Sequence, residues 1–176
     1  DYVVKGIGNG LTAPHDLECE SDVKALVWLL SESVAQRLRE SRLRCRTISV
    51  GARWARDLTG YSRQTTVRVP TCLTRDIANF AMGLLRANQP FDKDHALRAI
   101  HVRVTNLVPM DVPVQCDLFG DAAEVVRMER LDLAIDALRV RFGNTCVKRA
   151  VELTDDVMSG LDIKRDNTVH PIGFLR

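Results

Sequence analysis

The sequence is poor in aromatic residues, which make up 5% of its 176 residues, and it has no long apolar run. Its longest apolar stretch spans residues 25–30, whereas a membrane helix needs roughly 18 residues. The N-terminus lacks the basic, apolar and small-residue series of a secretory signal. The chain also begins without Met, which we expect of a processed product or of a piece of a longer protein. We therefore expect a cytoplasmic protein with no membrane partner.

Clustered metal ligands and catalytic motifs are also missing. The five cysteines are widely spaced without a C-x-x-C pair, and the four histidines are scattered. This pattern favours isolated thiols in a reducing compartment over a disulfide scaffold or a zinc site. The sequence contains no P-loop and no G-x-S-x-G motif. We expect no cofactor, metal or catalytic residue in this chain.

Charge is unevenly distributed along the chain. Residues 1–110 contain 16 Lys and Arg against 11 Asp and Glu, whereas residues 111–176 contain 9 against 12. Residues 37–68 contain nine arginines and only two acids, Glu40 and Asp57. The nine are Arg37, Arg39, Arg42, Arg44, Arg46, Arg53, Arg56, Arg63 and Arg68. Guanidinium groups bind phosphate oxygens in pairs, so this pattern favours a nucleic-acid surface, with a solvated helix face and basic loop as the alternative.

The apolar periodicity predicts six elements in the first 108 residues. They are a strand over 2–7, a helix over 23–41 capped by Ser21 or Asp22, strands over 47–54 and 62–69, a helix over 74–87 and a strand over 99–107. Residues 8–20 are predicted to form a loop, and Pro70 is predicted to end its strand. This order predicts an α+β fold, the split β-α-β-β-α-β arrangement with both helices on one face of a single sheet.

The opposite face of that sheet is predicted to be open. Strand alternation places on it Thr47, Ser49, Arg53, Gln64, Thr66, Arg68, His101, Arg103 and Thr105. A surface with these side chains and no carboxylate is suited to the phosphate backbone of DNA. An RNA-binding domain that stacks bases is disfavoured, because such domains need aromatic side chains on the open face.

The remainder of the chain is predicted to be helical. Residues 110–114 read as a proline-containing linker, and a helix over 122–142 ends at Gly143, with Leu131, Ile135, Leu138 and Phe142 on one side. A shorter apolar segment spans 147–153, and residues 154–176 show no strong pattern. We divide the chain into a sheet domain over 1–108, a linker over 109–121 and a helical C-terminal tail over 122–176.

Four segments, in order, resemble the C-terminal part of Y-family translesion DNA polymerases. They are Lys5-Gly6-Ile7-Gly8-Asn9 with Thr12 and Pro14; Val34-Ala35 with Arg37-Leu38-Arg39; Ser62-Arg63-Gln64-Thr65-Thr66 before Pro70; and Gln115-Cys116-Asp117-Leu118-Phe119 followed by Ala134-Ile135-Asp136 and Arg141-Phe142-Gly143. The resemblance is to the little finger domain and tail of the bacterial branch of this family. It implies a four-stranded domain that holds primer–template duplex against the polymerase palm, fingers and thumb.

The resemblance implies DNA contact by Lys5, Arg63, Thr65 and Thr66. The predicted open face adds a second set of DNA-contact candidates, which are Arg53, Gln64, Arg68 and Arg103.

The segment from Gln115 to Phe119 resembles the bacterial clamp-binding motif. The Gln115 amide would bond to backbone at the rim of a pocket, while Leu118 and Phe119 would fill an apolar cleft of the sliding clamp; Cys116 and Asp117 complete the motif. Cys116 replaces the usual Leu, so we expect weaker binding. The alternative is that Leu118 and Phe119 pack under the helix over 122–142.

The sequence lacks the acidic motifs with which the family's palm binds two metal ions, so we expect this chain to have no catalysis of its own. The parent polymerase would use magnesium. The leading hypothesis is therefore a DNA-holding portion of a translesion polymerase that also binds the clamp. A protein-interaction module with minor DNA contact and a free-standing enzyme are the alternatives.

Overall fold

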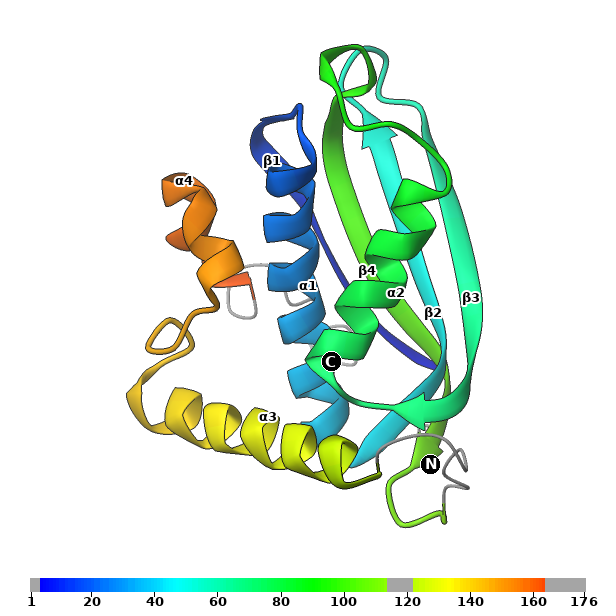
Figure 1. The fold of residues 1–176 in the computed structure, drawn as a ribbon, viewed down its shortest axis with the longest axis vertical. Coiled ribbons are helices and arrows are strands. Elements are labelled where there is room, and N and C mark those ends of the chain that lie inside the picture. The colour runs from blue at the N-terminus through cyan, green and yellow to red at the C-terminus, as the bar shows by residue number, and fades with distance from the viewer. Residues whose placement is uncertain (1–3, 114–121, 164–176) are drawn as a thin grey trace, which may run out of the picture.

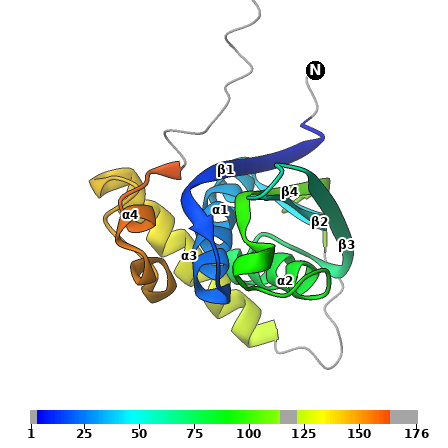
Figure 2. The same cartoon turned by 90° about the horizontal axis from the view of Figure 1, so that it is seen from above.

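The computed structural model describes residues 4–113 and 122–163 (Figure 1). A four-stranded antiparallel sheet has the order β1-β4-β2-β3. Its elements are β1 (Gly6–Leu17), α1 (Glu20–Glu40), β2 (Leu43–Trp54), β3 (Gly60–Thr71), α2 (Thr74–Arg86), a 3-10 turn (Lys93–His95) and β4 (Leu97–Pro109). Both helices cover the same face of the sheet (Figures 1 and 2). The predicted split β-α-β-β-α-β fold is confirmed.

The core lies between this face and the two helices. In the two central strands, Ile48 and Val50 of β2 and Val102 and Val104 of β4 are fully buried. The apolar positions of α1 and α2 that recur every three to four residues complete the same core. Because strand side chains alternate, burial of these positions sends their neighbours to the opposite face.

Several predicted boundaries are wrong. Strand β2 begins at Leu43 rather than at residue 47, and β4 extends beyond residues 99–107 at both ends. Strand β1 continues through the predicted loop, because it pairs with β4 from Gly6 to Thr12 and, after a break in register, at Leu17. Helix α1 begins at Glu20, with Cys19 rather than Ser21 or Asp22 at its N-cap. Strand β3 runs past Pro70, which an edge strand tolerates because one side of its backbone needs no partner.

The C-terminal extension packs against α1 and the start of α2. It consists of α3 (Ala122–Phe142), a 3-10 turn (Ala150–Thr154) and α4 (Asp156–Ser159). Residues 154–163, for which the sequence predicts no regular structure, contribute Met158 and Ile163 to the core. The Asn9 amide of β1 donates to the carbonyl of Ile163 at 3.2 Å, which ties the end of this segment to the first strand.

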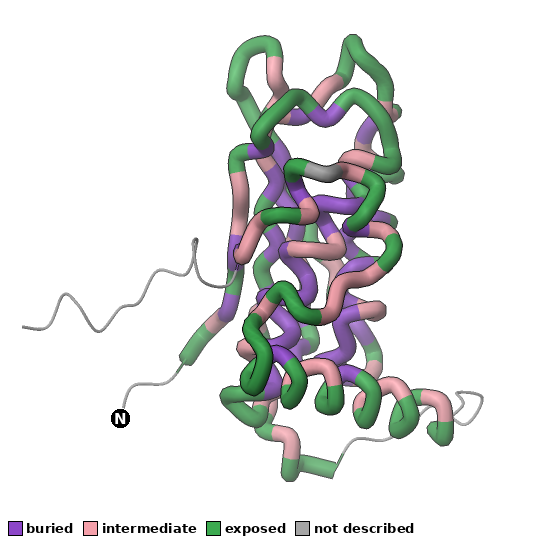
Figure 3. Tube along the Cα trace, turned by 90° about the vertical axis from the view of Figure 1, so that its left-hand side faces the viewer, coloured by how far each residue is buried: buried purple, intermediate pink, exposed green. Residues whose placement is uncertain are grey.

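Helix α3 contacts the sheet domain through its charged side. Asp132 is 2% exposed, whereas the predicted apolar row contains Leu131 at 46%, Leu138 at 43% and Phe142 at 61% (Figure 3). The helix therefore has the predicted bounds, but most of its apolar row faces solvent.

Within the described residues, no helix has both the length and the apolar character to cross a membrane. The four cysteines in this part of the chain are free thiols, two of them buried. Burial raises the pKa of Cys45 to about 12 and that of Cys72 to about 11, so both remain protonated at neutral pH.

Candidate nucleic-acid interface

The open face of the sheet is polar and basic across all four strands. Thr47 of β2 lies between Thr66 and Thr105, and Ser49 lies between Gln64 and Arg103. Towards the other end, Gly51 lies between Ser62 and His101, and Arg53 between Gly60 and Ala99. No carboxylate and no Phe, Tyr or Trp occupies these paired positions. The predicted composition of this face is confirmed wherever the ladder defines it.

On this face, strand β1 carries mainly glycine, and so contributes few side chains of its own. Three outward positions of β1 are Gly6, Gly8 and Gly10, which pair with Thr105, Arg103 and His101, and a fourth, Thr12, pairs with Ala99. A Cβ on Gly8 would lie 3.2 Å from Cβ and Cγ of Arg103, so the side chains of β4 lean over β1. Missing side chains let another backbone approach a strand closely. The space above these glycines is therefore occupied by side chains of β4, and Arg103 and His101 cover this part of the face.

A shallow hollow of about 390 Å³ lies at the β1 edge of this face. Gly8, Gly10, His101 and Arg103 line it, together with Arg37 of α1, whose Nη1 donates to the carbonyl of Gly8 at 3.0 Å. The sequence placed Arg37 in the arginine-rich segment and in the second family-like segment, but did not predict that it would contact β1. Its position between helix and sheet edge depends on packing that periodicity does not specify.

The basic character of the open face comes from arginine and not from histidine. Burial lowers the pKa of His101, and the charges of Arg53 and Arg103 lower it further. His101 is therefore neutral at pH 7, between two permanent cations. Phosphate oxygens would meet two guanidinium groups here and no competing carboxylate.

The eight predicted DNA-contact residues fall into three groups: four on the open face, two on the helix-covered side and two outside the paired positions. Arg53, Gln64, Thr66 and Arg103 lie on the open face. Lys5, just before β1, and Arg68, beyond the register shift in β3, are exposed.

Arg63 and Thr65 lie on the helix-covered side of the sheet, because they pair with the buried residues Val50 and Ile48. The Arg63 guanidinium lies 5.5 Å from the centre of the Tyr61 ring. Adjacent residues of a strand point to opposite faces, so alternation alone separates Arg63 from Gln64.

Two arginines of the basic segment form ion pairs with carboxylates of α3. Arg39, 7% exposed, binds both carboxylate oxygens of Asp136 at 2.6 and 2.9 Å and one oxygen of Asp132 at 3.1 Å. Arg44 donates to Glu129 at 3.0 Å. The density of arginine in the sequence therefore overstates the basic surface, since acids about 90 residues away neutralise part of it.

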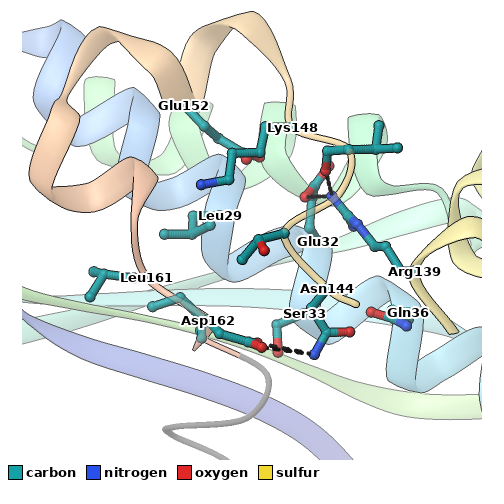
Figure 4. A pocket seen from close by; sticks show the side chains of 13 residues that line it. Leu29, Glu32, Ser33, Gln36, Arg139, Asn144, Lys148, Glu152, Leu161 and Asp162 are labelled. Atoms are coloured by element: carbon teal, nitrogen blue, oxygen red, sulfur yellow. Dashed lines mark hydrogen bonds and ion pairs between the residues drawn. The ribbon is translucent and has the colours of Figure 1, made fainter. Parts of the chain in front are cut away.

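A second charged cluster lies between α1 and the C-terminal extension (Figure 4). Arg139 and Arg149 donate to the two oxygens of Glu32 at 2.5 and 2.6 Å. Glu152 lines the same small cavity and is 3% exposed. Burial, the nearby charge of Glu32 and a hydrogen bond with Glu32 raise the pKa of Glu152 to about 8. A protonated Glu152 can donate a hydrogen bond to Glu32, which links the 3-10 turn over Ala150–Thr154 to α1.

The sequence also predicted a clamp-binding segment and the lack of a metal site. The clamp-binding segment, Gln115 to Phe119, lies outside the described residues. Among the residues that the structure describes, no group of three or more His, Cys, Asp and Glu side chains is arranged to hold a metal ion.

Comparison with known proteins shows three kinds of similarity. Residues 4–118 match the family model described as the impB/mucB/samB family C-terminal domain. DNA polymerase IV of Acetivibrio thermocellus is 38% identical over 152 residues, which cover 86% of this chain and 37% of that protein. DNA polymerase IV of Moorella thermoacetica is 34% identical over 151 residues, covering 86% of this chain and 36% of that protein. A solved complex of a beta-clamp processivity factor and the little finger domain of PolIV has a TM-score of 0.48 and 18% identity, covering 65% of this chain and 99% of that chain.

The chain thus spans just over a third of the length of these two relatives. A match over 152 residues necessarily includes α3, because the residues before it number only 121. Helix α3 therefore lies beyond the family model but within the region shared with the relatives.

Proposed function

Because this chain belongs to the impB/mucB/samB C-terminal domain family, the little finger of Y-family DNA polymerases, we propose that it holds primer–template duplex during lesion bypass. The longer protein would be a translesion polymerase of the DNA polymerase IV type. This chain would grip the duplex backbone and also dock on the sliding clamp. Its palm, fingers and thumb partners would lie in the part of the relatives that this chain does not cover.

The observation that carries the proposal is the open face of the sheet. It presents Arg53 and Arg103 among hydroxyl and amide side chains, has no carboxylate at its paired positions, and lacks β1 side chains at Gly6, Gly8 and Gly10, so that Arg103 extends over that strand. Arginine, threonine and serine contacts to phosphate position a protein on DNA without reading the base sequence. We therefore expect binding that ignores base sequence and weakens steeply with salt, with a Kd on the order of 10⁻⁴–10⁻⁶ M at physiological salt.

Anisotropy of a labelled primer–template duplex across a salt series tests the proposal. Arg53→Glu/Arg103→Glu should weaken binding at least tenfold at low salt, because two phosphate contacts become repulsive. Arg127→Glu/Arg130→Glu is the matched control, since it changes the net charge equally on α3 and leaves both sheet arginines in place. Equal losses in the two variants would show a net-charge effect only. Absence of wild-type binding at low salt would refute the proposal.

Arg63 is tested on its own, because it lies on the other side of β3. If Arg63→Glu weakens duplex binding as strongly as Arg103→Glu does, the duplex also contacts the β3 edge. If Arg63→Glu has no effect, the interface is confined to the open face.

The proposal for the clamp rests on the sequence of residues 115–119. Leu118→Ala/Phe119→Ala should abolish binding to a bacterial sliding clamp and leave duplex affinity unchanged, with the exposed Leu58→Ala as control. Point variants are preferable to truncation after Met110, because removing α3 would take away the carboxylates that bind buried Arg39. Strong clamp binding without duplex binding would favour the interaction module.

Catalysis is assigned to the remainder of the longer protein. Incubation of this chain with primer–template, Mg²⁺ and deoxynucleotides should give no primer extension. Extension that survives purification to homogeneity would instead establish a free-standing enzyme.

A further inference from the structure

A groove lies between the first turns of α3 and the ends of β3 and β4 (Figure 1). Its volume is about 430 Å³, within the range of about 300–1,000 Å³ that is typical of ligand sites. Most of its lining residues are apolar: Val69, Pro70, Met110, Val112, Pro113, Ala122, Val125 and Val126. Val112 is 46% exposed, and Val125 and Val126 on α3 are 41% and 46% exposed. Both walls of the groove therefore present apolar surface to solvent, which is typical of an interaction site.

Arg44 connects the two walls of this groove. Its Nη1 donates to the carbonyl of Met110 at 3.1 Å, and its Nη2 donates to Oε1 of Glu129 at 3.0 Å. The Met110 N–H in turn donates to the carbonyl of Arg42 at 2.9 Å. Helix α3 is fixed separately through its ion pairs with Arg39. The groove is therefore preformed, so a ligand would bind without ordering its walls.

The charged groups around the groove are mainly acidic. Its lining contains three carboxylates, Asp76, Asp111 and Glu129, and one guanidinium, Arg44. Arg44 is already paired with Glu129. Arg75 approaches Asp76 at 3.6 Å but pairs more closely with a carboxylate of α3. Asp111 is exposed. A cationic ligand would therefore meet an excess of negative charge here, whereas an anionic ligand would be repelled.

The apolar surface continues from the groove along one flank of α3. Leu133 is 54% exposed and lies about two turns beyond Val126. At about 100° per residue, these two side chains are only about 20° apart around the helix axis, so they belong to one row. A helical ligand lying along this flank would reach both positions, because its own apolar side chains recur at the same spacing.

We propose that this groove binds an amphipathic helical segment of another protein that carries apolar and basic side chains. Apolar side chains of the segment would enter between Val112 and Val126, which lie on opposite walls. Its lysine or arginine side chains would lie beside Asp76 and Asp111. This chemistry is opposite to that of the basic open face, so the groove adds a protein contact that does not depend on DNA binding.

Other occupants suit the groove less well. Duplex DNA would bring phosphates to a site that has more carboxylates than cations. A twofold contact between two copies through this groove would bring the acidic residues of both copies together. The connecting residues 114–121 include Leu118 and Phe119, but they contain two aspartates and no lysine or arginine. They therefore lack the charge that the groove favours.

The test uses the full chain and three labelled helical peptides, with anisotropy as the measurement. The first peptide has leucines at i, i+3, i+4 and i+7 flanked by lysines; the second has glutamate for lysine; the third has serine for leucine. The lysine–leucine peptide should bind at least tenfold more tightly than either of the others. Val112→Ser/Val126→Ser should weaken its binding at least tenfold, because both walls lose an apolar contact. Asp111→Lys should weaken its binding at least threefold and should strengthen binding of the glutamate peptide.

All substituted side chains are exposed, so the variants should unfold at the wild-type temperature. Val157→Ser in α4, at a site 57% exposed, is the control for the valine substitutions. Glu18→Lys, at an exposed position before α1, is the control for the charge reversal. Both control variants should bind the lysine–leucine peptide like wild type.

Duplex binding separates this proposal from the proposed DNA-holding function. Val112→Ser/Val126→Ser should leave duplex affinity unchanged, and Arg53→Glu/Arg103→Glu should leave peptide affinity unchanged. Either proposal can therefore fail while the other holds.

Several results would overturn the proposal. The first is equal binding of the three peptides, or no binding of any. Peptide binding that appears only in a Leu118→Ser/Phe119→Ser variant would assign the groove to the chain's own connecting residues. A dimer that Val112→Ser/Val126→Ser dissociates would assign it to a second copy.

Discussion

The imidazole of His101 lies over the backbone of Gly51, where a Cβ would be 1.8 Å from Cε1 of the ring. These two residues pair across β2 and β4 on the open face. Because Gly51 has no side chain, the His101 ring can pack flat against β2 between Arg53 and Arg103. The shape of the candidate DNA surface thus depends on a residue that carries no functional group.

Gly51→Ala should destabilise the domain, because the new methyl group forces the exposed His101 ring to leave its position over β2. We expect a loss of about 0.5–1.5 kcal/mol, measured by urea unfolding. Gly83→Ala in α2 is the control: a Cβ there meets nothing within 4 Å, and alanine should stabilise the helix by about 0.5–1 kcal/mol. A Gly51→Ala protein as stable as wild type would show that the ring moves freely.

Arg39→Ala should be among the more damaging single substitutions, although Arg39 belongs to a segment that the sequence presents as surface. It would remove the cation that binds both oxygens of Asp136 and leave Asp132 with Arg149 alone, and breaking a buried pair in this way costs about 3–5 kcal/mol. Arg46→Ala, at an exposed position of β2, should change the free energy of unfolding by about 0.5 kcal/mol or less. Similar unfolding midpoints for both variants would contradict the ion-pair assignment.

The contribution of Glu152 to stability should fall as pH rises. Its pKa is about 8 in the folded protein against 4.5 for the ordinary value, so the folded state binds this proton more tightly than the unfolded state. The contribution is complete below about pH 4.5 and is lost progressively up to about pH 8. Glu152→Gln should remove this part of the pH dependence, and unfolding measured at intervals across that range tests it. A wild-type profile parallel to that of Glu152→Gln would contradict the assignment.

Cysteine accessibility should separate the thiols into two groups. Cys19 and Cys146 are exposed and should react with a thiol reagent in the native protein. Cys45 and Cys72 are buried with raised pKa values, so they should react only after unfolding. Mass spectrometry of labelled peptides distinguishes these sites, and native labelling of Cys45 would show that the core opens readily.

Much of the sheet domain could be predicted from periodicity. Alternation in residues 47–54 and 99–107 assigned Arg53 and Arg103 to the open face, because burial of one side of a strand leaves the other side exposed. The β1 prediction failed at Gly8 and Gly10, since local preference for a loop was weaker than pairing with β4, whereas Pro14 lies where the ladder is interrupted between Thr12 and Leu17. Turn-forming residues report what a segment prefers in isolation and not whether a neighbouring strand is present.

The sequence by itself determined the order and kind of the elements, and it determined that α3 has an apolar row and a charged side. Only the tertiary structure decided which side of α3 would meet the domain. Arg39 needed buried carboxylates, and the N-terminus of α2 needed an acceptor, which Asp132 supplies to the backbone N–H of Thr74 at 3.0 Å. Periodicity shows that a helix has two faces, but the choice between them depends on partners far away in the chain, whose positions exist only after folding.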